Sequence, residues 1–454
     1  MHKITVKDFP HLDFGDVRRD QRFVKMIVNI SKQPGTSIPK QSGSWYDTKA
    51  VYNFFKNEEV TLESLQKTIS AYGVSKVKEL DQVLIIHDMS NISYNDLEAE
   101  DLGYLDSKEG RGIMCYSSIA ASVEGLPLAL MYQHTWTRPL EQVGKAKNRK
   151  NRSFEDKESY RWYEGMTEVK NSIGNSIKKI HIADRGADVY ELFFSAYEPN
   201  TDLLIRASHN RRLVDGSHLW DSIGQQQSKE IVTLDIPDAK GRKKLNIKAE
   251  VRYNKVEILR PARSNDKYES VELTAIEVRQ TGVVANEEAR ICWRLLTTLE
   301  VRSSSDVVKY IKWYTYRWLI ERFHYVLKSG TKIEELQLKE ATSLQKAISV
   351  YSLAAFRIMQ MVYESRHYPD VSCEVVLTKE QWVVLYMLIN QNRDIPKIPP
   401  SFSQAVRWIG KLGGHLGRNS DGPPGLKTVW EGYKRLCDAA SVYQIMNTKL
   451  VTEN

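Results

Sequence analysis

Four polar side chains of different chemistry lie in one stretch, residues 306–328, at spacings that could bring them together. Tyr314, Arg317, Glu321 and Lys328 contribute a phenol, a guanidinium, a carboxylate and an ammonium. If the stretch is an α-helix, which turns by about 100° per residue, the other three side chains lie within about 40° of Glu321. Three groups suited to phosphate oxygens would then surround one carboxylate. Such a surface could hold a nucleic-acid backbone against a carboxylate-bound metal ion.

The stretch has the features of a single helix. It contains no Pro or Gly, three serines at 303–305 precede it as candidate N-caps, and Gly330 follows it. We therefore expect one helix of about six turns, whose opposite face, with Leu319 and Phe323, is apolar and buried. A polar stripe on an amphipathic helix is more often only a solvated face, so the stripe alone does not establish a site.

Two further carboxylates follow predicted strands. Residues 82–87 (QVLIIH) read as a buried strand that ends at Asp88, and residues 178–183 (KKIHIA) as another that ends at Asp184. The remaining predicted elements are strands at 113–121, 126–134 and 203–206 and helices at 154–173 and 188–197.

The predicted order is three antiparallel strands, helix, strand, helix, strand. This is the order of an RNase H-like α/β domain, a mixed five-stranded sheet with flanking helices. In that fold the first and fourth strands are neighbours whose C-terminal ends share an edge of the sheet. We therefore expect Asp88 and Asp184 to lie side by side.

Three carboxylates fit the needs of phosphodiester hydrolysis. Two Mg²⁺ ions about 4 Å apart can activate the attacking water and neutralise the leaving 3′ oxygen. We expect Asp88 to bridge the ions and Asp184 and Glu321 to hold one each, with Mn²⁺ able to substitute. For either aspartate by itself, capping a loop is the commoner role. Asp188, one turn past Asp184, is interpreted as a charge at the start of a helix.

The polar stripe resembles the Y-R-E-K signature of bacterial insertion-sequence transposases of the cut-and-paste DDE type. HDMSNISY around Asp88 and ADRGAD around Asp184 are similar to the first and second catalytic motifs of that family. Met89 departs from the pattern, because relatives tend to carry a small hydroxyl residue there. The resemblance implies that the two aspartates and Glu321 are catalytic. It also implies that the phenol, guanidinium and ammonium of the stripe contact DNA.

Residues 207–290 form a long, largely strand-like segment, which we interpret as a β subdomain inserted before the last catalytic carboxylate. By resemblance, such an insertion is typical of the hairpin-forming subgroup, in which Trp293 would receive a base flipped out of the duplex. The alternation around Trp293 also fits a buried core residue. Arg206 similarly resembles a contact to flanking DNA. With His209, Arg211 and Arg212, it could equally belong to a solvated basic turn.

Residues 1–70 read as a basic helical domain. The helix predicted at 17–32 carries four cations on one face: Arg18, Arg19, Arg22 and Lys25. A second helix is predicted at 45–55, with Asp47 as its cap. A small helical subdomain with a solvated face and a DNA-end-reading domain are both compatible with this pattern. The resemblance to the transposases, which begins with the GDxRR-like start, favours the DNA-end-binding domain.

The remaining chain divides into two predicted domains. Residues 71–365 form the catalytic domain, and residues 366–454 form a helical C-terminal domain. The C-terminal domain could simply cap the core. WIGKLGGHLG and LKTVWEGYKRL within it are similar to the final segment of the transposases, which implies dimerisation there.

Composition limits the class of protein. The chain has 454 residues, with 65 Lys plus Arg against 57 Asp plus Glu, a net charge of +8 that favours a polyanionic partner. Four widely spaced cysteines indicate neither a CxxC metal site nor a disulfide framework. The sequence has no apolar run of membrane-spanning length, no signal-peptide core, no Walker loop and no HExxH motif. We expect a soluble bacterial cytoplasmic protein.

These features together predict a DNA transposase. We expect a homodimer that binds the inverted-repeat ends of its element, cuts them through metal-dependent hydrolysis and hairpin formation, and joins the 3′ ends to target DNA. The residues themselves support only a metal-dependent nuclease of RNase H-like fold, and transposition rests on the resemblance. A structure-specific nuclease without strand transfer and a catalytically silent DNA-binding descendant are the alternatives.

Overall fold

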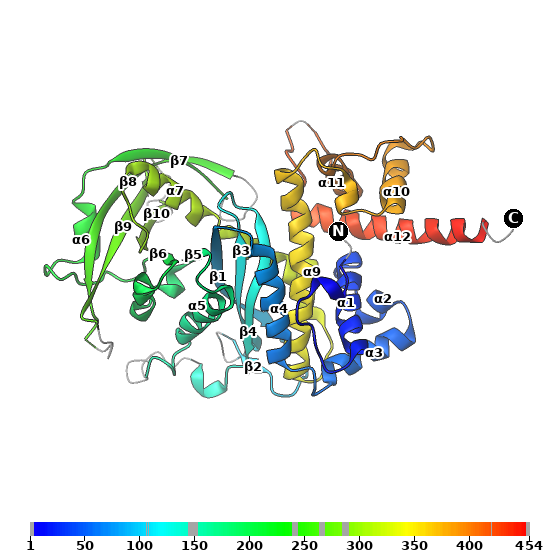
Figure 1. The fold of residues 1–454 in the computed structure, drawn as a ribbon, viewed down its shortest axis with the longest axis horizontal. Helices are drawn as coiled ribbons and strands as arrows, with labels where there is room; N and C mark the ends of the chain where they lie inside the picture. The colour runs from blue at the N-terminus through cyan, green and yellow to red at the C-terminus, as the bar shows by residue number, and fades with distance from the viewer. Residues whose placement is uncertain are drawn as a thin grey trace.

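The computed structural model describes residues 4–105, 107, 109–143, 153–237, 244–262, 268–283, 290–418 and 420–450. Figure 1 shows a large twisted sheet on one side and two groups of helices on the other, with α9 running between them. The basic run KAKNRKNR at 145–152, which the sequence pattern predicts to be a loop, lies outside the described residues. None of the described helices is long and apolar enough to span a membrane.

The N-terminal region is helical, as predicted. Its elements are the short 3-10 helix η1 (Val6–Asp8) and the helices α1 (Val17–Lys32), α2 (Ile38–Ser42), α3 (Trp45–Lys56) and α4 (Leu62–Val77). The predicted cap of α3 is wrong. Ser44, not Asp47, is the N-cap, and its hydroxyl accepts the backbone N–H of Asp47 at 3.1 Å. The Asp47 side chain is therefore available for other partners.

The first half of the sheet follows the predicted strand order. Its strands are β1 (Gln82–Ser93), β2 (Gly103–Tyr104), β3 (Arg111–Ala121), β4 (Pro127–Trp136), β5 (Lys178–Ala183) and β6 (Thr201–Arg206). β3 pairs antiparallel with β1, β2 and β4, whereas β5 pairs parallel with β1 and with β6. The predicted neighbourhood of the first and fourth long strands is therefore confirmed.

β1 is buried on both faces, which explains its continuous apolar run. Val83 and Ile85 pack in the cluster that contains α5, whereas Leu84 and Ile86 pack in the cluster that contains α9. The predicted end of this strand is wrong, because β1 continues past Asp88, paired with β3, to Ser93.

The helical segments between these strands are shorter than predicted. They are the 3-10 helix η2 (Leu140–Gln142), α5 (Tyr160–Ile173) and the 3-10 helices η4 (Arg185–Ala187) and η5 (Tyr190–Tyr197). The predicted α-helix at 188–197 is instead 3-10 helix from Tyr190. Asp188 lies between η4 and η5, so the interpretation of Asp188 as a helix-start charge is replaced by the contacts described below.

The segment after β6 extends the same sheet. It contributes α6 (Leu219–Gly224), β7 (Glu230–Pro237), β8 (Lys244–Leu259), β9 (Ser270–Gln280) and β10 (Cys292–Thr297). β10 pairs with β6 on one side and with β9 on the other, so that one ten-stranded sheet results. The five expected strands are present in the order β4-β3-β1-β5-β6, and the inserted β segment continues their sheet through β10. Pairing with β10 satisfies the edge of β6 that a five-stranded sheet would leave open.

The C-terminal half is helical. Its elements are α7 (Ser304–Thr315), α8 (Trp318–Tyr325), the π-helix η7 (Val326–Gly330), the 3-10 helices η8 (Ile333–Glu335) and η9 (Cys373–Val375), and α9 (Ala341–His367), α10 (Lys379–Asn390), α11 (Phe402–Leu412) and α12 (Leu426–Leu450). α9 is buried along most of its length between β4 and α1. Figure 1 shows α12 projecting away from the body of the molecule. All four cysteines are free.

Candidate active site

Asp88 and Asp184 occupy equivalent positions on neighbouring parallel strands. The last parallel pair between β1 and β5 joins Ile86 to Ile182, and each aspartate lies two residues farther along its strand direction. Side chains two residues apart along an extended chain point to the same face. The two carboxylates therefore lie at one edge of the sheet, on the face against which α8 and α9 pack.

A buried histidine pair lies under this edge on the opposite face. Nε2 of His87 is 2.8 Å from Nδ1 of His181, and Nδ1 of His87 is 2.7 Å from the hydroxyl of Ser118. Burial lowers the pKa of His87 well below its usual range and the pKa of His181 to about 3, so both rings stay neutral at physiological pH. The pair joins β1 to β5 directly before Asp88 and thereby helps to fix the spacing of the two aspartates.

Asp184 is held by the turn that follows it. Its carboxylate accepts the backbone N–H of Gly186 at 2.8 Å and so caps η4. Burial raises the pKa of Asp184, and the charge of Asp88 acts in the same direction, whereas Arg317 and Arg206 oppose the shift. Two carboxylates that disfavour each other's charge form a site that a divalent cation would stabilise.

Helix α8 faces Asp88 with a histidine that the sequence analysis missed. Nδ1 of His324 lies 3.6 Å from Oδ2 of Asp88, which is longer than a hydrogen bond. His324 is buried, and its Nε2 has no hydrogen-bond partner among the residues that the structure describes. His324 follows Glu321 by three residues, so the two share one helix face. This E-x-x-H spacing was the available signal in the sequence.

The helix predicted at 306–328 is not continuous. Tyr316 and Arg317 form a turn between α7 and α8, where backbone N–H groups bond three residues back, as from Leu319 to the carbonyl of Tyr316 at 2.8 Å. The ring of Tyr316 lies directly over Gly125, so tertiary packing at this point accompanies the break. Helix propensity alone could not reveal it, because the stretch contains no Pro or Gly.

Glu321 is paired with the guanidinium of Arg317. Nη2 of Arg317 lies 2.7 Å from Oε1 of Glu321. The Glu321 side chain is 45% exposed and that of Arg317 is 14% exposed. An ion pair that is open to solvent on one side is weak, so either partner can exchange for a stronger ligand. Arg317 also lies within electrostatic range of the two aspartates. Its charge acts to lower the pKa of Asp184, and the charge of Asp88 acts to raise the pKa of Arg317.

The other two members of the polar stripe differ in exposure. Tyr314 is only 3% exposed, and its hydroxyl has no hydrogen-bond partner within the described part of the chain. Burial raises the pKa of Tyr314, although nearby Arg317 and Arg206 oppose the shift. Nζ of Lys328 is 3.3 Å from Oδ1 of Asn91 on β1, three residues past Asp88. The buried phenol therefore has no exposed surface for DNA, whereas Lys328 lies beside the strand that carries the first aspartate.

Trp293 lies in the core in this structure. It is 5% exposed and contacts Tyr314 and Trp318 with ring centroids 5.4 and 5.8 Å away. Arg206, at the end of β6, donates from Nη2 to the carbonyl of Cys292 at 3.2 Å, and burial lowers its pKa. The structure therefore brings Arg206 near Asp184, but it leaves Trp293 without an open ring face for a flipped base.

Asp188 holds the basic turn after β6 in place, a role that the sequence analysis missed. Its side chain is 0% exposed. Oδ2 accepts hydrogen bonds from the backbone N–H groups of Ser208 and His209 at 2.7 and 2.9 Å, and Oδ1 accepts Nη2 of Arg211 at 2.6 Å. Arg211 therefore does not fit the alternative of a solvated basic turn, because it is paired with buried Asp188. The partners lie 20 to 23 residues from Asp188, so no local pattern could have revealed them.

The expected cations of α1 are all engaged within the N-terminal domain. Arg18 pairs with Asp16 at 2.7 Å, and Arg19 donates to the carbonyl of Phe14 at 2.7 Å. Arg22 and Lys25 both contact the carboxylate of Asp47. The helix has the predicted cationic residues, but its charge is partly neutralised by these contacts.

The described residues around the two aspartates have the chemistry of a magnesium site, but they do not lie close enough together to hold an ion. Among the described residues, no three His, Cys, Asp or Glu side chains are close enough to hold a metal ion. The donors are carboxylates, the ligands that Mg²⁺ prefers. Burial and, to a lesser extent, the charge of Asp88 raise the pKa of Asp184, and a bound cation would favour its ionised form. Glu321 is the member that would have to leave its present partner, Arg317.

Comparisons with known proteins identify both ends of the chain. Residues 1–60 match the family described as Transposase DNA-binding, and residues 353–443 match the family described as Transposase Tn5 dimerisation domain. A cryo-EM structure of the piggyBac transposase synaptic complex with hairpin DNA aligns at 10% sequence identity and a TM-score of 0.37. The alignment covers 76% of this chain and 65% of that chain.

Proposed function

We propose that this chain is a cut-and-paste DNA transposase. The proposal proceeds from the premise that the chain carries the DNA-binding and dimerisation domains of the Tn5-family transposases. It would bind the inverted-repeat ends of its own mobile element, cut them, and join the freed 3′ ends to target DNA. The domain composition is that of a Tn5-family DNA transposase, and it supports a homodimer that holds two ends together. Between the two matched segments lies the sheet that bears the candidate active site.

The observation that carries the enzymatic part of this proposal is the register of Asp88 with Asp184 on adjacent parallel strands. The order β4-β3-β1-β5-β6, antiparallel up to β1 and parallel after it, is that of an RNase H-like domain. In such a domain, carboxylates at this edge serve phosphodiester chemistry. Burial and the nearby charge of Asp88 raise the pKa of Asp184, and carboxylates with raised pKa values cluster at functional sites.

We assign Asp88, Asp184 and Glu321 as the residues that would hold two Mg²⁺ ions, with Mn²⁺ able to replace them. The ions, when bound, supply activation of the attacking water and charge neutralisation at the leaving 3′ oxygen. The chain's own contribution is to fix the two aspartates through paired strands and to deliver Glu321 from α8.

Arg317 has a second task in this assignment. In the free protein its guanidinium pairs with Glu321 at 2.7 Å. A DNA phosphate offers the same fork of oxygens to a guanidinium and forms charge-assisted hydrogen bonds of similar strength. Exchange of Arg317 from Glu321 to a phosphate would free the carboxylate at the moment when the substrate arrives. Lys328, beside β1, would hold a second phosphate.

The burial of Trp293 favours a second candidate for the chemistry. A nuclease that cuts one strand needs no receptor for an unstacked base, whereas hairpin formation forces a base out of the duplex. With Trp293 5% exposed, the hairpin step requires either its uncovering or another receptor. An RNase H-like nuclease without the hairpin step is therefore the alternative.

The test uses DNA that carries the inverted repeats flanking the gene. Purified protein is incubated with this DNA and Mg²⁺, and the products are resolved on a denaturing gel. Nicked strands, then hairpin ends, then joined target DNA are the expected products. Nicking without end selectivity or joining would support the plain nuclease. A duplex with scrambled ends is the matched control, because it keeps length and charge but removes the recognised sequence.

A further inference from the structure

One acidic side chain forms ion pairs with two cations of the DNA-binding domain. Asp47, in the first turn of α3, receives Nη1 of Arg22 at 2.6 Å on Oδ1 and Nζ of Lys25 at 2.9 Å on Oδ2. Both cations come from successive turns of one face of α1. Hydrogen bonds from Arg22 and Lys25 lower the pKa of Asp47 to about 2, so it is ionised at physiological pH.

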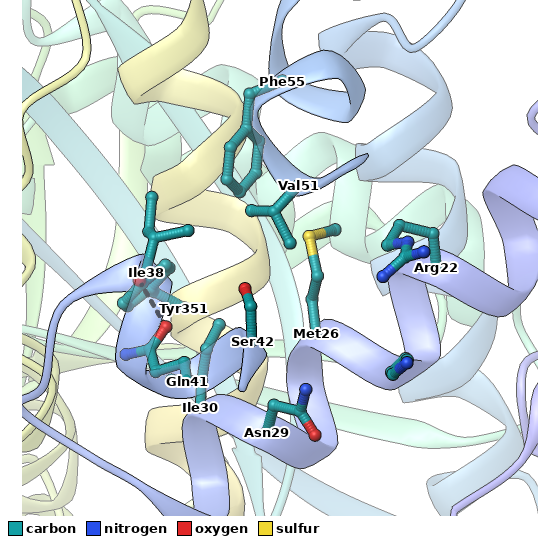
Figure 2. A pocket seen from close by; sticks show the side chains of 11 residues that line it. Arg22, Met26, Asn29, Ile30, Ile38, Gln41, Ser42, Val51, Phe55 and Tyr351 are labelled. Carbon is teal, nitrogen blue, oxygen red and sulfur yellow. Dashed lines mark hydrogen bonds between the residues drawn. The ribbon is translucent and has the colours of Figure 1, made fainter. Parts of the chain in front are cut away.

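The cluster lies at the rim of a pocket between α1, α2, α3 and α9. Figure 2 shows Arg22 at the right of this pocket, Ser42 and Asn29 toward its lower part, and the apolar side chains of Met26, Val51 and Phe55 above them. Lys25 also lines the pocket. The rim therefore combines cations with neutral hydrogen-bonding groups, the set that contacts a nucleic-acid backbone.

The surroundings of the cluster fit DNA better than an internal brace. Two large aromatic side chains immediately before Asp47, Trp45 and Tyr46, are 79% and 77% exposed. The Lys25 side chain is 49% exposed, whereas those of Arg22 and Asp47 are 17% and 18% exposed. Open aromatic rings beside cations form a surface that suits sugar, base and phosphate together. Residues 1–60 match a DNA-binding family, which commits this surface to DNA.

A carboxylate held by a guanidinium and an ammonium occupies the position that a phosphate group would take. Both anions present paired oxygens to the same donors. Because the cluster is partly open to solvent, its ion pairs contribute little to stability and can exchange. When a phosphate displaces Asp47, the carboxylate stays nearby and repels the phosphate, so its charge weakens DNA binding.

We propose that Arg22 and Lys25 form a site for a backbone phosphate of the bound DNA, and that Asp47 occupies this site in the free protein and thereby limits the affinity for DNA. This inference rests on the proposed function in one respect only, namely that the bound DNA is the end of the mobile element. The contact itself is to the backbone, so it applies to any duplex that the domain binds.

The experiment measures binding of the full-length protein to fluorescently labelled duplexes by anisotropy at KCl concentrations from 50 to 200 mM. One duplex carries the inverted repeat and the other a scrambled sequence. Asp47→Asn keeps the shape of the side chain and removes its charge. Glu63→Gln is the matched control, since it removes one charge from an exposed ion pair with Lys67 on α4, 2.9 Å apart. Melting curves for every variant report whether folding is preserved.

Asp47→Asn should bind both duplexes about 5- to 10-fold more tightly than wild type, because one repelling charge is removed. Lys25→Gln should bind more weakly and reduce the slope of log K against log salt by about 0.9. Glu63→Gln should match wild type.

Unchanged or weaker binding by a well-folded Asp47→Asn protein would overturn the inference and make Asp47 a brace between α1 and α3. Failure of the proposed function appears separately, as equal affinity of the wild-type protein for repeat and scrambled duplexes. In that case the tighter binding of Asp47→Asn to both duplexes would still support the phosphate site.

Discussion

Replacing Asp188 by asparagine should damage the catalytic edge although Asp188 is not a member of the carboxylate set. Its carboxylate is 0% exposed, and its partner Arg211 is 9% exposed. Oδ2 accepts hydrogen bonds from two backbone N–H groups and one hydroxyl, and Oδ1 accepts two from the guanidinium. An asparagine keeps one acceptor oxygen, so the bonds to the other oxygen are lost and the guanidinium remains buried without a counter-charge.

Loss of one partner from a buried ion pair costs about 3–5 kcal/mol. The turn that Asp188 holds begins directly after β6, which ends at Arg206, and Asp188 itself follows Asp184 by four residues. We therefore expect Asp188→Asn to lower the melting midpoint by several degrees and to reduce DNA cleavage, with end binding by the N-terminal domain preserved.

A double variant distinguishes an effect on the position of the turn after β6 from an effect on the stability of the protein. Asp188→Leu with Arg211→Met removes both charges, and such replacements often recover the stability of a buried pair. The double variant should melt above Asp188→Asn but below wild type, because the backbone N–H groups of Ser208 and His209 have lost their acceptor, and it should still cleave poorly. Thermal melting and a time course of cleavage on a denaturing gel measure the two effects. A wild-type melting midpoint for Asp188→Asn, or wild-type cleavage by the double variant, would refute this reasoning.

Three further predictions follow from individual sites. Trp293→Ala should lower stability by about 3–5 kcal/mol and reduce nicked, hairpin and joined products together, because Trp293 is 5% exposed; selective accumulation of nicked DNA in a normally folded variant would instead assign it to the flipped base. Helix α12 has an exposed apolar stripe at positions i, i+3 and i+4, formed by Val442, Ile445 and Met446, which are 57%, 62% and 63% exposed. Ile445→Asp should therefore weaken dimerisation in sedimentation experiments, whereas Asn447→Asp, off that stripe, should not. Mg²⁺ should raise the melting midpoint of wild-type protein but not of Asp184→Asn, since the cation offsets the burial and the repulsion from Asp88 that raise the pKa of Asp184; equal shifts would place the ion elsewhere.

The strands and their neighbours could be predicted because local pattern and burial agree. β5 has the predicted bounds, and Asp88 and Asp184 belong to adjacent strands because the connectivity leaves few alternatives for the sheet. The extension of the sheet through β10 could not be predicted. Strand-like sequence after β6 is equally compatible with a separate sheet, and only the pairing partner of β6 decides between them.

Side-chain partners were the least predictable part of the site. The spacing of Arg317 and Glu321 predicted a shared helix face for contacts to DNA and metal, whereas in the structure the two side chains pair with each other. Asp47 was predicted as a helix cap, yet Ser44 takes that role and leaves Asp47 to Arg22 and Lys25 on another helix. Contacts of this kind join residues that are distant in sequence, so periodicity and capping rules do not contain them.

The central claim is that Asp88, Asp184 and Glu321 form one active site for strand cleavage, whereas other residues bind the DNA ends. The most direct test measures end binding by gel shift and strand cleavage in Mg²⁺ on the same labelled inverted-repeat duplex, for wild type and for Asp88→Asn, Asp184→Asn and Glu321→Gln. Each variant should retain end binding and lose cleavage, because these carboxylates serve the chemistry and not the recognition. Cleavage at a near wild-type rate by any one of the three would contradict the assignment of that residue and the site built on it.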